Sequence, residues 1–416
     1  MEEIDVVVIG AGQAGLSSAY FLRRFGLETV VLDAADGPGG AWRHRSPTLT
    51  MDKVHGIFDL PGVRREPGAD GRRPAAEAVP AYYAAYEREL GLGVLRPVTV
   101  SAVTPGPHDR LLVTAAPGNV DAPNRPYAQA GTDVPDRPYA QGGTDVPDRP
   151  YAQGGTDVPD RPYAQGGTDA PDRPYARREW AARAVVNATG TWTRPYWPYY
   201  PGARDFLGRQ LHYAAYRGPE AFAGRRVVVV GGGHSAAHVL SELAGVAAGT
   251  LWVTRRPPDL REDDFGEDAR REAVARVEAR VRAGLPPQSV VGVTGLGHTP
   301  VVREALEKGA LDRLPMFTRI TPYGVAWADG REEPADTIIW ATGFRSALDH
   351  LAPLHLRRPG GGIAVDGTRA LADPRVQLVG YGPSASTVGA NRAGRTAARN
   401  VHRLLTSSAP LTTPAA

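Results

Sequence analysis

Two glycine-rich turns constrain this chain more than any other feature of its sequence. One is Gly10–Gly15, which reads GAGQAG, and the other is Gly231–Ala236, which reads GGGHSA and begins about 220 residues later. Each turn follows a strand-like apolar run and opens a predicted helix, and this context is typical of turns that receive a dinucleotide pyrophosphate. Two such turns predict two bound dinucleotides, most simply a flavin and a nicotinamide in facing sites.

The chain contains no cysteine. Flavoenzymes that pass electrons through a redox dithiol need a thiolate, so the sequence excludes that class of enzyme. What remains is hydride transfer from a nicotinamide, after which the electrons leave to oxygen or to another small acceptor.

Charge and hydropathy narrow the range of partners. The formal net charge is +3 and no run of five or more basic residues occurs, so we expect no nucleic-acid partner. The start, Met1-Glu2-Glu3, is acidic, and no apolar stretch approaches the roughly 18 residues that a membrane helix needs. We therefore expect a soluble, cytoplasmic protein with no membrane partner. Its oligomeric state stays open, a homo-oligomer included.

The first turn has the full context of a dinucleotide-binding unit. Gly10 makes the turn, Gly12 lets the backbone approach the pyrophosphate, and Gly15 lets the helix pack on the strand. Asp33 ends the next strand, where its carboxylate is expected to accept from a ribose hydroxyl and to repel a 2′-phosphate. This favours FAD or NAD. The predicted elements are a strand at Ile4–Ile9, a helix at Leu16–Phe25 and a strand at Thr29–Leu32.

The second unit has the same spacing but the opposite charge at its ribose end. Thr254 takes the place of Asp33 and is followed by Arg255 and Arg256. A charge-assisted hydrogen bond contributes roughly 1.5–3 kcal/mol, so one good contact to a 2′-phosphate shifts the preference by about tenfold or more. We expect NADPH to be preferred over NADH. The alternative is that both arginines are only solvated charge in an arginine-rich chain.

A repeat interrupts the chain between the two turns. Residues 125–172 are four nearly identical twelve-residue units, such as RPYAQGGTDVPD. Each unit has one tyrosine and at most one valine against two prolines, which is too little apolar surface to offset the entropy of ordering it. We expect a disordered low-complexity insert over 119–176, between strands at 111–114 and 184–186. It is either a neutral expansion or a partner-binding repeat.

Outside the insert, strands and helices alternate as in doubly wound α/β sheets. The expected fold has two Rossmann-like dinucleotide-binding domains, an FAD domain into which an NADPH domain is inserted. The FAD domain is expected at 1–118, 177–190 and 341–405, the NADPH domain at 191–340 and a tail at 406–416. Further expected elements are a strand at 226–230, a helix at 267–283 with Val274, Val277 and Val281 on one face, a strand at 376–379 and a helix from Ser384 to Arg395 that begins near the flavin ring.

Three kinds of motif connect these blocks. Phe206–Tyr216 matches FxGxxxHxxxY, Ala188–Gly190 and Ala341–Gly343 both read ATG, and Gly39–Trp42 reads GGAW. Together they resemble the motifs of flavin-containing monooxygenases and their class B relatives, over the whole chain except 119–176. The resemblance implies FAD and NADPH as cofactors, with O2 and a small organic molecule as substrates. It also implies that one oxygen atom passes through a flavin hydroperoxide to a nucleophilic nitrogen or sulfur.

The sequence departs from the family pattern at two places. Baeyer–Villiger members have a proline after the last aromatic of the fingerprint, whereas Arg217 follows Tyr216 here, which argues against ketone insertion. Many heteroatom-oxidising members carry an asparagine after GGxW, and Leu49–Lys53 has none. His212 is either a hinge residue near NADP, as discussed for the family, or a structural histidine. The aromatic stretch Trp192–Tyr200 is expected to be interdomain packing, the alternative being a substrate box.

The expected cofactor contacts gather at the turns and at the ATG triplets, where small residues let backbone pass close to a ligand. No catalytic residue is singled out, and no metal site is expected. His234 and His238 are spaced like a zinc pair, but they lie on the helix that receives the pyrophosphate. The expected cofactor-binding residues are Gly10, Gly12, Gln13, Ala14, Gly15, Asp33, Gly40, Trp42, Met51, Asp52, Ala188, Gly190, Gly231, Gly233, His234, Ser235, Ala236, Arg255, Arg256, Ala341, Thr342 and Gly343.

Two other functions are compatible with the same two turns. An NADPH oxidase or reductase would use both sites to make peroxide or to reduce a small acceptor, without oxygen transfer. A flavoprotein that acts mainly as an accessory protein, binding a partner through the repeats, is the alternative from another class.

Overall fold

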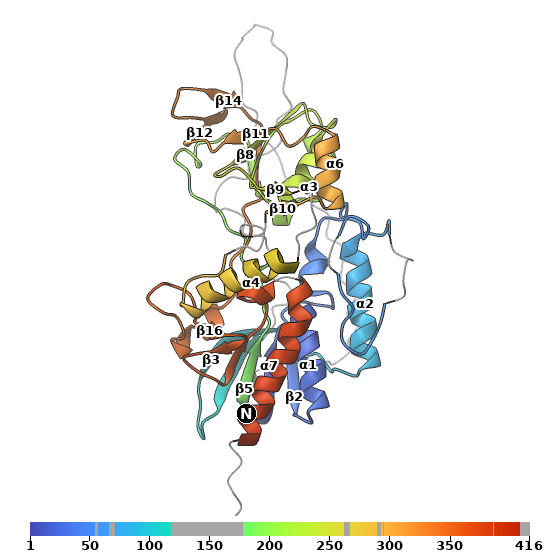
Figure 1. Cartoon of the computed structure of the whole chain (residues 1–416), viewed down its shortest axis with the longest axis vertical. Helices are drawn as coiled ribbons and strands as arrows, with labels where there is room; N and C mark the ends of the chain where they lie inside the picture. The colour runs from blue at the N-terminus through green and yellow to red at the C-terminus, as the bar shows by residue number, and fades with distance from the viewer. Residues whose placement is uncertain are drawn as a thin grey trace, which may run out of the picture. The chain divides into compact units, whose positions relative to one another are not determined.

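The computed structural model contains two large sheets (Figure 1). Each glycine turn directly follows a strand of one of these sheets. The structure describes residues 1–54, 57–65, 71–117, 178–261, 267–288, 293, 295–385 and 387–407. The predicted repeat insert at 119–176 lies outside the described residues. The strand that follows it is described from Arg178 onward. The described residues of both sheets belong to one compact unit, so the division into an FAD and an NADPH domain stays a proposal.

The first sheet has eight strands and is built around two parallel strands, β1 and β5. Val6–Ile9 of β1 lie opposite Ala184–Asn187 of β5, and all of these residues are buried. The strand order is β16-β17-β18-β5-β1-β2, and β4 pairs with both β5 and β3. The bounds are β1 Glu2–Ile9, β2 Thr29–Leu32, β3 Val98–Pro105, β4 Leu111–Pro117, β5 Arg178–Asn187, β16 Val365–Asp366, β17 Arg369–Ala370 and β18 Val376–Leu378.

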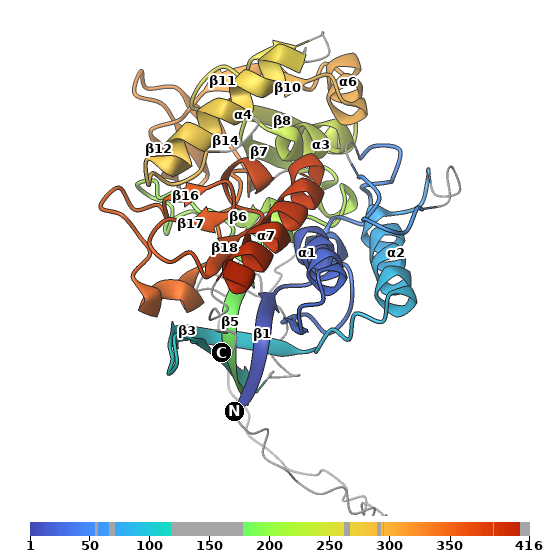
Figure 2. The same ribbon diagram turned by 60° about the horizontal axis from the view of Figure 1, so that its bottom comes forward.

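Three helices flank this sheet, and two of them pack closely. Helices α1 and α7 lie side by side (Figure 2), and their apolar residues share one core with Val6, Val8 and Val186. The approach depends on Gly394 of α7, because a Cβ there would lie 2.7 Å from Ser17 Oγ of α1. The bounds are α1 Gln13–Arg24, α2 Ala75–Glu89 and α7 Thr387–Ser407.

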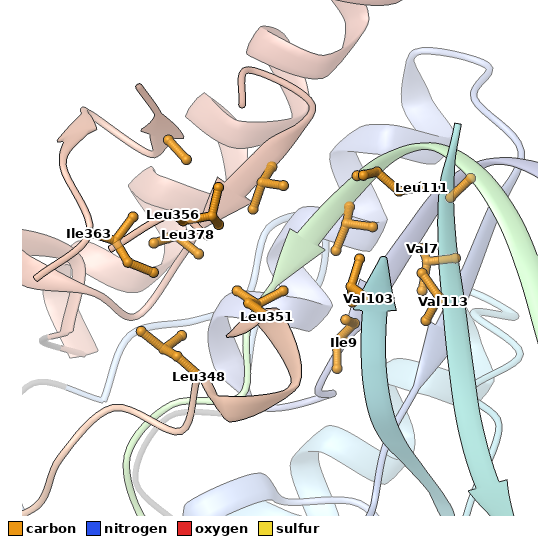
Figure 3. Packing of buried hydrophobic residues seen from close by; sticks show 14 of the residues in the cluster. Val7, Ile9, Val103, Leu111, Val113, Leu348, Leu351, Leu356, Ile363 and Leu378 are labelled. Carbon is orange, nitrogen blue, oxygen red and sulfur yellow. The ribbon is translucent and has the colours of Figure 1, made fainter. Parts of the chain in front are cut away.

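The opposite face of the sheet has its own core. Val7 and Ile9 alternate with Val6 and Val8 along β1, as the two-residue period of a strand requires, and face a second cluster. In that cluster they meet strands β3 and β4 together with the 3₁₀-helix η4, Asp349–Leu354 (Figure 3). Leu348 and Leu351 carry the segment after the second ATG triplet back onto the first sheet.

The second sheet has five strands, all parallel, in the order β11-β8-β7-β15-β6. Its central strand β7 is four-fifths valine, and Val227–Val230 are buried, as expected of a strand covered on both faces. Helices α3 and α6 pack together beside it. The bounds are β6 Arg209–His212, β7 Arg226–Val230, β8 Gly249–Thr254, β11 Arg313–Pro315, β15 Thr337–Trp340, α3 His234–Leu243 and α6 Pro300–Glu307.

Smaller elements complete the described fold. A three-stranded antiparallel sheet and a two-stranded parallel one accompany the second sheet in the chain. Their strands are β12 Arg319–Thr321, β13 Gly324–Ala326 and β14 Glu332–Pro334, and β9 Leu260–Arg261 and β10 Leu296–Gly297. The other helical segments are α4 Glu267–Arg282 and the 3₁₀-helices η1 Gly40–His44, η2 Tyr213–Ala215, η3 Glu220–Phe222 and η5 Gly382–Ala385.

The element predictions are confirmed in kind and corrected at their ends. The strand at 226–230 is β7, but the first helix begins at Gln13 because Gly12 is already its N-cap. The helix expected from Ser384 begins at Thr387, because Gly382–Ala385 forms the 3₁₀-helix η5. That helix runs to Ser407, past the predicted start of the tail at 406.

Helix α4 corrects a second prediction. Val277 and Val281 are buried, but Val274 is 49% exposed, so the three valines do not share one buried face. Near the C-terminal end of α4, Val281 joins the core that holds Leu348 and Leu351. A helix predicted within the NADPH domain therefore packs on elements of the first sheet.

Membrane insertion finds no support among the described residues. None of the helices built from them is both long and apolar enough to cross a bilayer.

Candidate functional site

The three glycines of the first turn, Gly10, Gly12 and Gly15, have different surroundings. Gly10 has a φ of +99°, and a Cβ there would lie 2.6 Å from the carbonyl oxygen of Ala188. A Cβ on Gly15 would lie 1.9 Å from the carbonyl oxygen of Gly10, so only glycine lets α1 sit this close to the turn. At Gly12 the nearest protein atom to such a Cβ is the Gly40 Cα, 4.0 Å away. Neighbouring protein atoms therefore leave no room for a Cβ at Gly10 or Gly15, whereas there is room for one at Gly12.

The GGAW segment is the protein's nearest neighbour on that open side. Gly39 and Gly40 both have positive φ, and a Cβ on Gly40 would lie 2.8 Å from the Gly12 Cα. Trp42, two residues later in η1, packs against the core that α1 shares. The structure therefore brings the GGAW segment to Gly12, although the two are well separated in the sequence.

Asp33, at the end of β2, has a charged partner that the sequence reading missed. Its Oδ2 accepts from Arg96 Nε at 2.9 Å, and Arg96 donates its other two nitrogens to Glu87 at 2.7 and 2.8 Å. Burial works to lower the pKa of Arg96, but the bonds to Glu87 and the charge of Asp33 outweigh it and raise that pKa. Asp33 is therefore held in a fixed orientation by a buried ion triad, and its contact with a ribose stays a prediction.

Helix α7 supplies a second residue that sequence reasoning did not find. Asn391 Oδ1 accepts from Gln13 Nε2 at 3.3 Å, and the Asn391 carbonyl accepts from Ser17 Oγ at 3.1 Å. The start of α1 is thus tied to a helix 378 positions further along the chain. No local motif marks Asn391, because its partner is reached only through the fold.

The predicted positions Met51 and Asp52 lie in the loop after η1. The Met51 side chain packs against the core that contains α1. Asp52 is exposed and accepts from the Thr50 hydroxyl. The loop holds Met51 against that core, whereas the Asp52 carboxylate is bonded within the loop, and the cofactor contacts of both residues stay predictions.

Each ATG triplet continues a strand, and its small residues let the backbone pass close to a glycine turn. Ala188 continues β5 and donates its N–H to Ile9, whereas Ala341 continues β15 and donates to Val230. Gly190 and Gly343 both have positive φ, and Gly343 accepts from Tyr196 N at 2.9 Å. Thr342 Oγ1 also donates to the Tyr196 carbonyl. Both crossings therefore run next to a glycine turn, Ala188 beside Gly10 and Ala341 beside Gly231.

The second turn repeats the geometry of the first. Gly231 has a φ of +143°, and a Cβ there would lie 2.2 Å from the Ala341 carbonyl oxygen. A Cβ on Gly233, the N-cap of α3, would meet no atom within 4 Å. Ala236 is fully buried and its N–H donates to the Gly233 carbonyl, so any contact it makes with a ligand is indirect. Ser235 lies beside Tyr213 of η2.

The ribose end of the second site is basic. Arg255 and Arg256 are exposed, whereas Thr254, the last residue of β8, is buried. Arg313 of β11, which the sequence reading missed, donates to Thr254 Oγ1 at 2.6 Å and to the Thr254 carbonyl at 3.2 Å. Three arginines therefore gather where the first site has Asp33.

His212 is a structural histidine. It is 2% exposed, its Nδ1 accepts from Ala214 N at 3.1 Å, and its Nε2 donates to the Gly343 carbonyl at 3.0 Å. Burial lowers its pKa to about 4, although the bond to Gly343 opposes this. The ring is neutral at physiological pH and joins the fingerprint motif to the second ATG triplet. That arrangement favours the structural reading over the hinge.

Acid is expected to destabilise the fold through His212 and His350. Burial lowers the pKa of each to about 4 from an ordinary value of 6.5. The unfolded chain therefore binds these protons first, so stability is retained above pH 6.5 and is lost as the pH falls toward 4. The loss is at most about 1.4 kcal/mol per pH unit for each histidine. Urea unfolding midpoints at pH 7, 6 and 5 would measure it.

Paired carboxylates also lose stability in acid, so variants must isolate the histidine contribution. His212→Gln and His350→Gln should each show a shallower fall in unfolding free energy between pH 7 and 5 than the unaltered protein. An identical slope in all three proteins would refute the assignment.

A buried polar network joins the loop after η1, the fingerprint and α3. Glu242 Oε2 accepts from Tyr216 at 2.8 Å and from Thr48 at 2.9 Å, and Glu242 Oε1 lies 3.1 Å from His238 Nε2. Burial alone would raise the pKa of Glu242, but the bonds from His238, Thr48 and Tyr216 outweigh it and lower that pKa. The last residue of the fingerprint therefore bonds to the helix that opens at the second turn.

These residues fit two dinucleotides. Neither α1 nor α3 has a side-chain hydrogen bond at its N-cap, and a helix N-terminus is an end at which phosphate oxygens bind. The space at Gly12 and Gly233 is where a pyrophosphate would approach the backbone. Among the described residues, no group of three or more His, Cys, Asp or Glu side chains is placed to hold a metal ion.

Comparison with known proteins identifies the family. A profile for flavin-binding monooxygenase-like proteins matches residues 176–259, and one for FAD-dependent oxidoreductases matches residues 5–109. A flavin-containing monooxygenase from Stenotrophomonas maltophilia is 36% identical, with 97% of this chain and 100% of that chain covered and a TM-score of 0.72. This chain belongs to the flavin-binding monooxygenase family.

Two more distant proteins are also similar to this flavin monooxygenase. An indole-3-pyruvate monooxygenase from Oryza sativa subsp. japonica is 26% identical over 374 residues, which cover 82% of this chain and 76% of the relative. Cyclohexanone monooxygenase shares the fold, at 17% identity and a TM-score of 0.59, with 98% of this chain and 88% of that chain covered. Membership of the family implies FAD and NADPH as cofactors and O2 with a small molecule as substrates.

Proposed function

We propose that this monooxygenase transfers one oxygen atom to a nucleophilic nitrogen or sulfur of a small organic substrate, and that it uses NADPH in preference to NADH. The first turn, Gly40 and Ala188 would hold FAD, and the second turn with the arginines beside Thr254 would hold NADPH. When bound, the two cofactors supply the hydride and the activation of O2. The protein residues orient both groups and exclude water.

The coenzyme preference is supported by the contrast between the two ribose ends. Asp33 is an acid fixed by Arg96, whereas Arg255 and Arg256 are exposed beside Thr254, which Arg313 holds in place. A 2′-phosphate carries negative charge and accepts several hydrogen bonds, so it is attracted to the second site and repelled from the first. This contrast is the single observation that carries the choice of NADPH.

Transfer to a heteroatom, as opposed to ketone insertion, is supported by the end of the fingerprint. Arg217 donates to the carbonyls of Ala214 and Tyr216 at 3.1 Å each, and to that of His44 at 3.4 Å. A proline, the residue typical of the Baeyer–Villiger pattern, could make none of these bonds. A murine dimethylaniline monooxygenase named as N-oxide-forming is 28% identical over 204 residues, or 40% of this chain, and supports the same choice.

Aromatic side chains close the region where the two crossings meet. Trp192 stacks on Phe344 with ring centroids 4.8 Å apart, and Phe344 meets the His212 ring edge-on at 5.0 Å. Within the described residues, this supports the packing role predicted for Trp192–Tyr200, although Tyr199 is 82% exposed. Excluding water between two cofactors protects a reactive oxygen donor from hydrolysis.

Product analysis tests the proposal. The purified holoenzyme would be given NADPH, O2 and one of three probes: a thioether, a tertiary amine or cyclohexanone. We expect sulfoxide or N-oxide with equal consumption of NADPH and O2, and no lactone. Lactone as the main product would overturn the heteroatom assignment. Peroxide formed in the full amount of NADPH oxidised, with every probe recovered unchanged, would favour the oxidase alternative.

A further inference from the structure

The loop at 46–53 contacts elements of both sheets. On the side of the first sheet, Ala75 N donates to the Leu49 carbonyl at 2.8 Å and Met51 N donates to the Arg73 carbonyl at 3.0 Å. Met51 adds an apolar contact, since its side chain packs in the core that contains α1. These bonds fix the loop to the beginning of α2 and to the side where FAD is proposed to bind.

The same loop reaches α3 and α6 of the second sheet at three successive points. Thr48 Oγ1 donates to Glu242 of α3 at 2.9 Å. Leu49 packs against the small core between α3 and α6. Lys53 Nζ forms an ion pair with Glu304 Oε2 of α6 at 2.8 Å. The loop is therefore joined to α3 and α6 by one hydrogen bond, one apolar contact and one ion pair, all between Thr48 and Lys53.

The ion pair uses a rare residue. Of the 48 lysines and arginines in the chain only two are lysines, Lys53 and Lys308, and both bind Glu304. Lys308 pairs with Glu304 Oε1 at 2.8 Å and also donates to the Ser241 carbonyl at 2.8 Å. A lysine ammonium is a compact charge with three rotatable donors, which suits such a shared site. Lys308 lies just beyond the end of α6 itself, so of the two lysines Lys53 is the one that joins α6 to the 46–53 loop.

Partial burial makes this pair more than a surface contact. The side chains of Lys53 and Glu304 are 28% and 26% exposed. Burial alone would raise the pKa of Glu304, but the bonds and charges of the two lysines outweigh it and lower that pKa. The Glu304 carboxylate therefore stays ionised. Because it is mostly buried, salt screens its attraction to Lys53 only weakly.

We propose that Lys53 and Glu304 are positioning residues that hold the 46–53 loop on α3 and α6, and so set the distance between the two dinucleotide turns for hydride transfer. This inference rests on the proposed function, since it needs a nicotinamide at the second turn. Neither residue touches the reacting atoms. They act through the loop that carries Met51 toward the first site.

Limited proteolysis of the full-length holoenzyme tests the loop directly. Lysyl endopeptidase can cut this chain at only two places, after Lys53 and after Lys308, and the fragments differ in size. Glu304→Gln should raise the rate of cleavage after Lys53 by about three- to tenfold, the range expected for loss of one partly buried ion pair. Lys308→Gln is the matched control: it also removes a partner of Glu304 but leaves Lys53 paired, so its Lys53 cleavage should stay unchanged.

Anaerobic reduction at saturating NADPH tests positioning. Lys53→Gln should slow flavin reduction by about three- to tenfold. Lys53→Arg should restore it and Lys308→Gln should leave it unaltered. The Kd for NADPH should change less than twofold, and reduction by dithionite should be the same in all variants. An unaltered NADPH reduction rate in Lys53→Gln, or equal Lys53 cleavage in the Glu304→Gln variant and the unaltered protein, would overturn the inference.

The two proposals fail in different ways. If NADPH does not bleach the flavin of the unaltered protein, the proposed function fails. The proteolysis comparison, which needs no coenzyme turnover, still decides whether Lys53 and Glu304 hold the loop.

Discussion

A valine at Gly12 is expected to give a folded but colourless protein. Gly12 has a φ of −78° and a ψ of −173°, a conformation open to any residue, and the nearest protein atom to an added Cβ is 4.0 Å away. The fold therefore tolerates the branch, whereas a pyrophosphate on the helix N-terminus does not. Losing contact to two N–H groups, at roughly 1.5–3 kcal/mol each, lowers FAD affinity by about a hundredfold or more. The flavin absorbance of the purified protein measures this.

Gly233→Val is the matched control for that experiment. Gly233 holds the same place in the second turn, with no atom within 4 Å of an added Cβ. This variant should stay yellow but should no longer be bleached by NADPH. Flavin retained in full by Gly12→Val, at an unchanged melting temperature, would mean that the first turn is not the FAD site.

Replacing Arg255 and Arg256 together by alanine is expected to raise the KM for NADPH by about tenfold or more. Each arginine is exposed and available to a 2′-phosphate, and a charge-assisted bond of roughly 1.5–3 kcal/mol corresponds to about a tenfold change or more. NADH lacks that phosphate, so its KM should change little. Steady-state kinetics with both coenzymes measure the ratio.

Arg319→Ala separates this effect from a general loss of positive charge. Arg319 is paired with Glu332 on the small antiparallel sheet, at 2.7 Å, and should leave both KM values as they are. Equal increases in KM for NADPH and NADH in the double variant would contradict the coenzyme assignment.

The sequence predicted those parts of the site that depend on local chain geometry. The roles of Gly10 and Gly15 follow from a turn only six residues long, and the glycine spacing alone indicates which position must stay open. The β7 strand was equally predictable, because four valines in succession fit a strand buried on both faces. His212 could be placed in a motif, but its two bonding partners could not.

What the sequence could not predict are partners brought in by other elements. Arg96 beside Asp33 and Arg313 beside Thr254 lie 63 and 59 positions from their partners. In a chain this rich in arginine, nothing local distinguishes them from the arginines on its surface. Asn391 is hidden for the same reason. Helix α4 packs on the first sheet and not, as predicted, within the NADPH domain, because a pattern of valines does not indicate which sheet they will pack against.

The join between α1 and α7 also bears on how the protein is made. A ribosome delivers residues from the N-terminus onward, yet Gln13 meets its partner Asn391 only after 378 further positions have been added. Strand β18, which extends the first sheet beside β5, comes almost as late. The nascent chain therefore cannot complete its first sheet or brace α1 until β18 and α7 have been synthesised. If FAD binds at the first turn, as proposed, that turn has its full support only once α7 has folded against α1.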